Sequence, residues 1–408
     1  MRRLATPPAL AAVALCAATA LLAGCPPKAM APVPATVALV VTPSEAADPY
    51  AYRGVEALVA ADAAAASASA KTRASSAPVV AIRHAVLPEA PTAKARAAAL
   101  SALLLESAKD PLVRAALVVP AVDGTADAFR ALRAQRRDIV RIAANPTEDR
   151  LSIESAVDLV VELDRLYRPY LAAASAKKAG ARALVEASAK GPFSPARERE
   201  SAVLRAACAE LGLTYVLALA DPGDRGRSLV GELGADRAVY CADAALADAV
   251  VGAALATGAF VVDGGPGSLD ACYRALAPSL PEDVWSIDAD KRFKLLEKVA
   301  VAAAGRGRLS VWTRDYAAQS VEGLAEFARR VAAGSARVDD LKDIVAALKS
   351  RTAGSAWIAA YDADPGTGVK AANHVLIRQD PYAFGRGYEQ SALRMVPPKF
   401  LAIGPASR

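Results

Sequence analysis

The sequence predicts an α/β protein in which two doubly wound lobes, each built on a parallel sheet, are joined by a hinge. From residue 37 onward, short apolar runs alternate with longer helical stretches. The runs are continuously apolar rather than alternating, which is typical of strands buried on both faces of a parallel sheet. Two successive series of such runs indicate two lobes, because 408 residues are too many for a single core.

The first series of runs predicts the N-terminal lobe, over residues 37–164. A helix whose apolar face carries Leu100 and Leu104 is expected at 91–109, and another at 124–137. Residues 62–77 are rich in Ala and Ser and are expected to form a helix end and a flexible loop. The predicted strands of this lobe are Val37–Thr42, Pro78–His84, Ala115–Pro120, Asp138–Ala143 and Val157–Glu162.

The second series predicts the C-terminal lobe, over residues 165–288, with helices at 165–179, 195–211 and 244–257. Its predicted strands are Arg182–Ala187, Thr214–Ala220, Arg237–Cys241, Ala259–Asp263 and Val284–Asp288. Alternation of strands and helices favours parallel pairing with helices on both faces.

Residues 289–408 are expected to cross the hinge and complete both lobes. Helices are predicted at 290–304, 317–333 and 338–350. Strand-like runs occur at Leu309–Thr313, Trp357–Tyr361 and His374–Arg378.

The N-terminus has the three parts of a secretory signal, over residues 1–24. Arg2 and Arg3 precede an apolar run at 9–23, which is shorter than the ~20 residues of a membrane-spanning helix. The stretch Leu22-Ala23-Gly24-Cys25 is similar to a bacterial lipobox, which implies cleavage before Cys25 and lipid on its thiol. Residues 25–36 then form a Pro-rich tether. An ordinary signal peptide with a chance cysteine is the alternative. We expect the protein in the cell envelope, lipid-anchored to a membrane and outside the cytoplasm.

Charge and cysteine content narrow the possible partners. The net charge is +6, with basic residues scattered among acidic ones, so no nucleic-acid-binding patch is expected. Cys208, Cys241 and Cys272 remain after cleavage and lipidation, and an odd number cannot pair completely. We expect buried free thiols.

Catalytic motifs are absent from the sequence. His84 and His374 are the two histidines, too few for a histidine-based metal site, and no cysteine pair has zinc spacing. The stretch 366–371 imitates a dinucleotide-binding motif but follows Asp364-Pro365, which indicates a turn. No catalytic residue, metal or cofactor is therefore predicted. Acid pairs such as Glu162/Asp164 and Glu148/Asp149 leave an acid/base enzyme open as a minor alternative.

Polar residues gather where the predicted strands end. In open α/β sheets, ligands bind beyond the carboxyl ends of the strands, so two such rims suit a small polar ligand in an interlobe cleft. The expected ligand contacts are Thr42, Ser44, Tyr50, Asp123, Thr125, Glu148, Ser188, Asp221, Asp243, Asp263 and Trp312. Alternatively, the hydroxyl and carboxylate residues cap helices, Tyr50 anchors a loop and Trp312 fills the hinge.

A set of short segments between Leu117 and Gly334 forms a recognisable pattern: Ala121–Phe129, Arg136–Ile139, Glu148-Asp149, Ala156–Val160, Lys178–Ala181, Ser194–Arg199, Cys208, Leu211-Gly212, Asp221-Pro222, Gly307-Arg308 and Trp312. In these segments the chain resembles a family of uncharacterised bacterial lipoproteins with a type I periplasmic-binding-protein-like fold. The resemblance implies the two-lobed fold and the cell-envelope location. Family members carry histidine and arginine in the loop that here reads 188–194, without histidine, so the ligand of this chain is expected to differ or to be lost.

Together these observations favour a membrane-anchored solute-binding lipoprotein that closes on an unknown small polar ligand and serves a permease or a sensor. The alternative is a structural or interaction lipoprotein that keeps the fold and binds no ligand.

Overall fold

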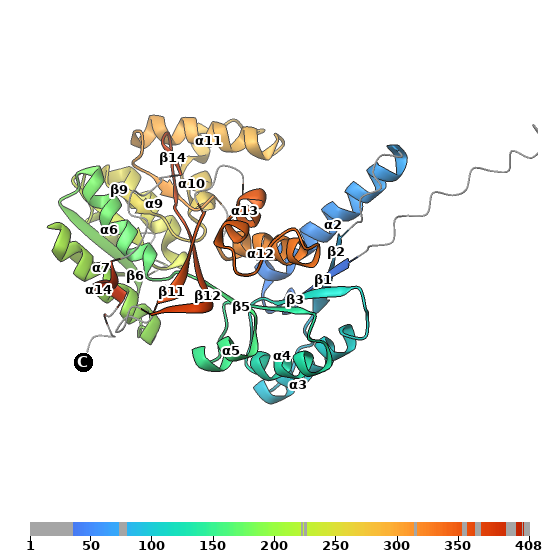
Figure 1. The fold of residues 1–408 in the computed structure, drawn as a ribbon. Coiled ribbons are helices and arrows are strands. Elements are labelled where there is room, and N and C mark those ends of the chain that lie inside the picture. Colours follow the sequence, from blue (N-terminus) through green and yellow to red (C-terminus); the bar gives the residue numbers. More distant parts are fainter. Residues whose placement is uncertain are drawn as a thin grey trace, which may run out of the picture.

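The computed structural model describes residues 36–72, 80–221, 223, 227–313, 316–352, 357–363, 369–388, 397–401 and 403. The predicted signal peptide, Cys25 and almost all of the tether lie outside these residues. Within them, the chain forms two α/β lobes side by side (Figure 1).

The N-terminal lobe is built on a seven-stranded sheet in the order β11-β12-β5-β4-β3-β1-β2. The strands β1 to β5 and β12 run parallel, and only the edge strand β11 is antiparallel. The strands are β1 Thr36–Thr42, β2 Val80–Val86, β3 Val113–Val118, β4 Val140–Ala144, β5 Leu159–Leu163, β11 Trp357–Ala363 and β12 Lys370–Gln379.

Helices cover both faces of this sheet, as buried parallel strands require. Figure 1 shows α3, α4 and α5 on one face and α12 and α13 on the other. The helices of this lobe are α2 Pro49–Thr72, α3 Ala93–Ser107, α4 Thr125–Gln135, α5 Arg150–Ala156, α12 Tyr316–Ala332 and α13 Leu341–Arg351.

The C-terminal lobe has a four-stranded parallel sheet in the order β7-β6-β8-β9, and Leu309 extends it by a parallel bridge to β9. A small sheet of β10, β13 and β14 lies beside it. The strands are β6 Ala183–Ala189, β7 Thr214–Ala220, β8 Arg237–Cys241, β9 Phe260–Asp263, β10 Ser310–Val311, β13 Tyr382–Ala383 and β14 Gly387–Tyr388.

The helices of the C-terminal lobe pack on both faces of the four-stranded sheet and form two separate apolar cores. Two short 3₁₀ helices, Ala244–Leu246 and Ala277–Ser279, precede α9 and follow α10. The α-helices are α6 Tyr167–Ala179, α7 Pro195–Leu211, α8 Arg227–Val230, α9 Ala247–Thr257, α10 Ser268–Leu276, α11 Ala289–Ala304 and α14 Pro398–Leu401.

Both lobes repeat the same doubly wound strand order, in which the second strand of the lobe lies outside the first and the third and fourth follow on the other side. The chain passes between the lobes three times: between β5 and α6, between β10 and α12, and between β12 and β13. These three connections form a multi-strand hinge, which permits rotation of one lobe against the other.

One predicted strand is wrong. Val284–Asp288 forms turns, with the N–H of Ser286 bonded to the carbonyl of Asp283, and the side chain of Asp288 caps the start of α11. The apolar Val284 that suggested a strand is buried in a loop, whereas Trp285 is largely exposed, with its ring tilted by 49° against that of Tyr273 at 5.2 Å. The other predicted strands and helices are present, with ends shifted by a few residues.

Candidate ligand pocket between the lobes

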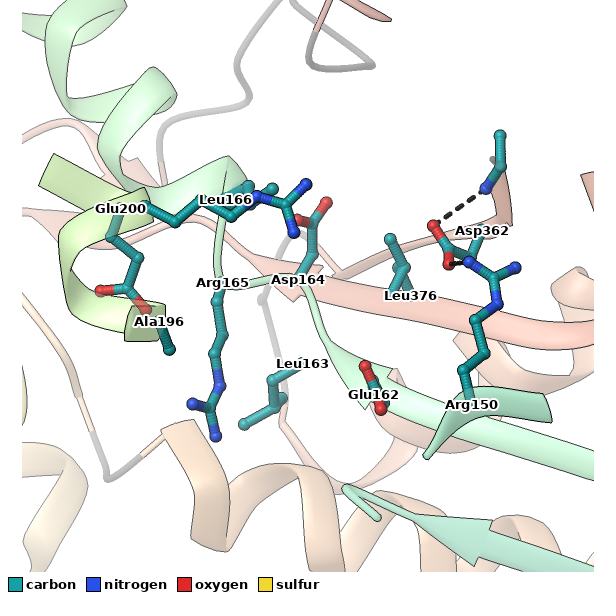
Figure 2. A pocket seen from close by; sticks show the side chains of 12 residues that line it. Arg150, Glu162, Leu163, Asp164, Arg165, Leu166, Ala196, Glu200, Asp362 and Leu376 are labelled. Atoms are coloured by element: carbon teal, nitrogen blue, oxygen red, sulfur yellow. Dashed lines mark hydrogen bonds and ion pairs between the residues drawn. The ribbon is translucent and has the colours of Figure 1, made fainter. Parts of the chain in front are cut away.

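A pocket of 310 Å³ lies beside the first connection between the lobes (Figure 2). Its volume is at the lower end of the ~300–1,000 Å³ that small-molecule sites occupy. The lining residues come from α5, β5, β11 and β12 of the N-terminal lobe, from the connection itself, and from α7 of the C-terminal lobe. They are Arg150, Glu162, Leu163, Asp164, Arg165, Leu166, Ala196, Arg199, Glu200, Asp362, Ala363 and Leu376.

Strand register brings the N-terminal wall together. Glu162 and Leu376 are partners in the parallel pairing of β5 and β12, so their side chains project from the same face of the sheet. Asp164 and Arg165 follow directly after β5, at the carboxyl end of the strand where ligands bind in open α/β sheets.

Helix geometry builds the opposite wall. Ser194 caps α7 by accepting a hydrogen bond from the N–H of Arg197, and a proline follows the cap as the first helical residue. Ala196, Arg199 and Glu200 then share one face of the helix, because residues three and four apart are neighbours. This face lines the pocket.

Some charges of the pocket are paired within the protein. Arg150 bonds Asp362 at 2.5 Å and Glu154 at 2.6 Å. Asp164 is buried, accepts a hydrogen bond from the N–H of Tyr167 at 3.1 Å, and pairs with the buried Arg378 at 3.1 Å. The Asp164–Arg378 pair joins the first connection to β12, the strand that leads into the third connection. Because these charged groups already have partners within the protein, they need few hydrogen bonds from a ligand.

Two carboxylates of the pocket are not paired in this way. Within the part of the chain that the structure describes, Glu200 accepts no hydrogen bond, and its nearest cation is Arg197 at 3.8 Å. Arg197 bonds instead with Glu186, which is fully buried, and with Ser188. Burial raises the pKa of the Glu200 carboxyl, and the charges of Arg197, Arg168 and Arg165 only partly oppose this effect.

Glu162 lies next to a buried histidine. Nε2 of His374 is 3.6 Å from Glu162, and Nδ1 is 2.7 Å from Glu154. Burial lowers the pKa of His374, but the two carboxylates outweigh it and hold that pKa above its ordinary value. The imidazole is therefore a positive group beneath the pocket floor at mildly acidic pH.

A second charged centre lies at the hinge. Asp263, at the end of β9, accepts hydrogen bonds from Nε and one terminal nitrogen of Arg168 at 2.9 and 3.0 Å. It also accepts bonds from Nε1 of Trp312 and the N–H of Gly265, both at 2.9 Å. The Arg168 guanidinium is held between the rings of Trp312 and Tyr240, at 4.4 and 5.1 Å from their centroids. This centre fixes two hinge connections to the C-terminal lobe.

The predicted contacts after β1 have partners inside the N-terminal lobe or face solvent. Thr42 is buried and its hydroxyl is 2.8 Å from Nε2 of His84. Ser44 donates to Glu89 at 2.7 Å and lines a separate pocket of 380 Å³ within this lobe. Tyr50 is exposed.

The predicted contacts around α4 form hydrogen bonds within the N-terminal lobe. Asp123 accepts a hydrogen bond from Thr147 at 2.6 Å, and the buried Thr125 donates to the carbonyl of Val122. Glu148 accepts bonds from two N–H groups at the start of α4, at 2.9 and 2.8 Å. Glu148 therefore supplies the capping that Gly124, the residue at the N-cap, cannot.

The predicted contacts of the C-terminal lobe are also bonded internally. Ser188 accepts from Arg197, Asp221 from an N–H two residues later, and Asp243 from the N–H of Ala189 at 2.8 Å. Of the eleven predicted residues, Asp263 and Trp312 contact each other, and none lines the interlobe pocket. As ligand contacts they stay predictions.

The pocket residues themselves were only partly visible in the sequence. Glu162 and Asp164 stood out as a pair of acids at a strand end, and the structure places both on the pocket wall. Arg165 and Glu200 carried no local signal, because their positions depend on how the two lobes pack.

Several other features bear on chemistry. Among the described residues, no group of three or more His, Cys, Asp or Glu side chains could hold a metal ion. Cys208, Cys241 and Cys272 are buried free thiols, and burial raises the pKa of each to about 12. They are therefore poor nucleophiles. The helices of the described part are too short or too polar to cross a membrane.

The topology defines the fold class: two doubly wound α/β lobes joined by three connections, as the sequence resemblance to type I periplasmic-binding-protein-like lipoproteins implied. The chain belongs to the family described as "Protein of unknown function (DUF3798)", whose model matches residues 37–310. A second family model, whose description names no function, matches residues 321–403.

Two relatives match part of this chain. Two uncharacterized proteins of Treponema pallidum (strain Nichols) are 38% and 34% identical over 113 residues, 28% of this chain. The chain spans about half the length of these relatives, 51% and 52%.

Among solved structures, a "Putative transcriptional regulator" from Clostridium difficile 630 is 17% identical, with a TM-score of 0.67, over 86% of this chain and 100% of that chain. An ABC transporter periplasmic solute binding protein from Actinobacillus succinogenes 130z with bound D-allose has a TM-score of 0.42 and 14% identity, over 74% of this chain and 93% of that chain. At 17% identity, the likeness to the Clostridium difficile protein shows the fold alone.

Proposed function

We propose that this protein is a membrane-anchored solute-binding lipoprotein that holds a small polar ligand between its lobes, for uptake through a permease or for sensing. The observation that carries the proposal is the pocket beside the first hinge connection. Charged side chains of both lobes line it, and two of its carboxylates have only long contacts to cations among the described residues, 3.6 Å for Glu162 and 3.8 Å for Glu200. The proposal includes no chemical step and no cofactor.

Hinge closure gives such a pocket its selectivity. Asp164 and Arg378 hold the first connection to β12, and Tyr167 donates to Asp380 at 2.7 Å, which joins α6 to the third connection. The connections therefore move together when one lobe rotates against the other. A ligand that contacts both walls favours the closed arrangement by its differential affinity for that state.

The anchor part of the proposal rests on the sequence. Cys25 follows Leu22-Ala23-Gly24, and the Pro-rich stretch up to residue 36 leads directly into β1 of the N-terminal lobe. A lipidated cysteine at this place would hold the N-terminal lobe close to a membrane surface, outside the cytoplasm.

Native mass spectrometry of the mature protein isolated from its own host tests ligand binding. We expect a copurified small molecule, and its addition to stripped protein should raise the melting temperature. At a hundred times Kd, binding stabilises the native state by about 2.7 kcal/mol. The control is Ala196→Trp, because Ala196 is exposed on the pocket wall and a large side chain there fills the space. Stabilisation that persists in this variant would place the ligand elsewhere.

The anchor is tested separately. The wild-type chain should fractionate with membranes and carry acyl mass on its new N-terminal cysteine. A Cys25→Ser chain should lose both properties and keep the ligand. Wild-type protein that carries no lipid would contradict the anchor and leave the pocket proposal standing.

A second function is favoured by one observation: ten of the eleven predicted cleft residues have partners within the protein. This suits a structural or interaction lipoprotein that keeps the fold without a ligand. It predicts that no small molecule copurifies and that no compound shifts the melting temperature.

A further inference from the structure

Two carboxylates from opposite lobes line the interlobe pocket with only long contacts to cations, 3.6 Å from Glu162 to His374 and 3.8 Å from Glu200 to Arg197. Glu162 belongs to β5 of the N-terminal lobe and Glu200 to α7 of the C-terminal lobe. We infer that the ligand carries ammonium nitrogen for which these carboxylates are the acceptors. The inference rests on the proposed function, since it names the ligand class of the same pocket.

Glu200 has the stronger need for a donor. Its side chain is 18% exposed, and within the described residues it accepts no hydrogen bond. A largely buried carboxylate without donors is costly, because desolvation is not offset. The raised pKa of Glu200 reports the same cost. A bound cation with N–H groups would remove it.

The arginines near Glu200 do not meet this need. Arg197 is one turn earlier on α7, but the fully buried Glu186 and Ser188 hold its guanidinium. Arg199 lies next to Glu200 in the chain and donates Nε to the carbonyl of Ile403 at 3.1 Å. The carboxylate therefore faces the pocket while the cations of its own helix are engaged elsewhere.

Glu162 contributes the second carboxylate from the other lobe. Its side chain is 36% exposed, and its nearest cation is the His374 imidazole at 3.6 Å. In Figure 2, Glu162 lies between Arg165 and the Arg150–Asp362 pair, with Glu200 on the α7 side. An ammonium offers three N–H donors to a carboxylate, and an amine ligand that contacts both walls would draw the lobes together.

Other ligand charges fit this pocket less well. A metal ion is disfavoured because the described residues bring no three metal-ligating side chains together. A purely anionic ligand would have Arg165 as a partner, but Arg165 is exposed, where water weakens its attraction. Such a ligand would also meet Glu162 and Glu200, and like charges at close range repel.

Three pairs of probes, which differ in ammonium against hydroxyl, test the inference: L-alanine and L-lactate, putrescine and 1,4-butanediol, glucosamine and glucose. Calorimetric titration of the mature chain should show at least one ammonium compound binding tenfold or more tightly than its hydroxyl partner. Glu162→Gln and Glu200→Gln should each weaken that compound roughly ten- to hundredfold, the range of a lost charge-assisted hydrogen bond.

The matched control is Glu198→Gln, which makes the same charge change on α7 outside the pocket lining and should retain the wild-type Kd. Ammonium binding that survives both pocket variants, or hydroxyl partners that bind equally well, would overturn the inference.

The same measurements separate the two proposals. If the copurified ligand lacks an amine nitrogen, or if only hydroxyl compounds bind and Ala196→Trp blocks them, the solute-binding function stands and the ammonium inference fails. If nothing copurifies and no probe binds, both fail.

Discussion

Two helix carboxylates, the buried Glu326 on α12 and the partly buried Glu200 on α7, have opposite surroundings in the fold. Glu326 is 3% exposed and accepts hydrogen bonds from Arg329, Arg330 and Arg351. Burial alone would raise the pKa of Glu326, but these bonds outweigh it and lower that pKa to about 2.

Glu200 is 18% exposed, has no such bonds among the described residues, and has its pKa raised by burial. Glu326, which holds α12 and α13 together, is surrounded by arginines. Glu200, at the lobe interface, accepts no hydrogen bond among the described residues. The difference separates structural from binding carboxylates, and the following predictions test it.

The largest loss of stability is expected for Asp263→Asn, at the hinge. The change leaves the Arg168 guanidinium buried without a counter-ion, which costs about 4 kcal/mol in comparable buried pairs. Urea unfolding monitored by circular dichroism measures the loss. Asp270→Asn, an exposed residue of α10, is the control and should change stability by less than about 0.5 kcal/mol. An Asp263→Asn loss as small as that of the control would mean that the pair has no structural role.

A somewhat smaller loss, about 3 kcal/mol, is expected for Glu326→Gln, because its three arginines are 24–30% exposed and water can partly replace the carboxylate. The pH dependence should change too. The folded pKa is depressed, so the stabilisation is present above the ordinary value and is lost as pH falls from about 4.5 to about 2. The Glu326→Gln variant should not show this loss of stability at acid pH. The same loss in the variant would mean that other carboxylates cause it.

The fold could be predicted from the sequence because its strands are continuous apolar runs between breakers, a local property. Thr214–Ala220 and Arg237–Cys241 have the predicted ends. The error at Val284–Asp288 has a physical cause. The Val-Trp pair resembles a strand core, but Asp288 prefers to cap α11 and Trp285 packs on Tyr273. Tertiary contacts override the local pattern there.

The candidate site was less predictable, since it depends on contacts between distant segments. The pattern of acids at strand ends singled out Glu162 and Asp164, and both line the pocket. It could not distinguish a cap from a free carboxylate: Glu148 and Glu200 look alike in sequence, yet Glu148 bonds two N–H groups at the start of α4. Arg197 is hydrogen-bonded to Glu186, eleven residues earlier, which leaves Glu200 only a long contact to Arg197 at 3.8 Å.

A moderate effect with its own pH signature is expected at His374. Its folded pKa is raised, so the stabilisation is present below its ordinary value and is lost as pH rises through the folded pKa. The groups that face it are Glu154, Glu162 and Asp362. His374→Gln should remove this alkaline slope, worth about 1.5 kcal/mol for a charge-assisted hydrogen bond. Thermal unfolding between pH 5 and pH 9 measures it, and equal slopes in both proteins would contradict the prediction.

The smallest effect is expected for Glu200→Gln without ligand, within about 0.5 kcal/mol of wild type or slightly more stable. The neutral amide avoids the desolvation of an unpaired carboxylate, and no cation loses a hydrogen-bonded partner. Urea unfolding at pH 7, measured beside Glu326→Gln, makes the comparison direct. A loss as large as that of Glu326→Gln would show that Glu200 is bonded within the protein, and the distinction between the two carboxylates would then fail.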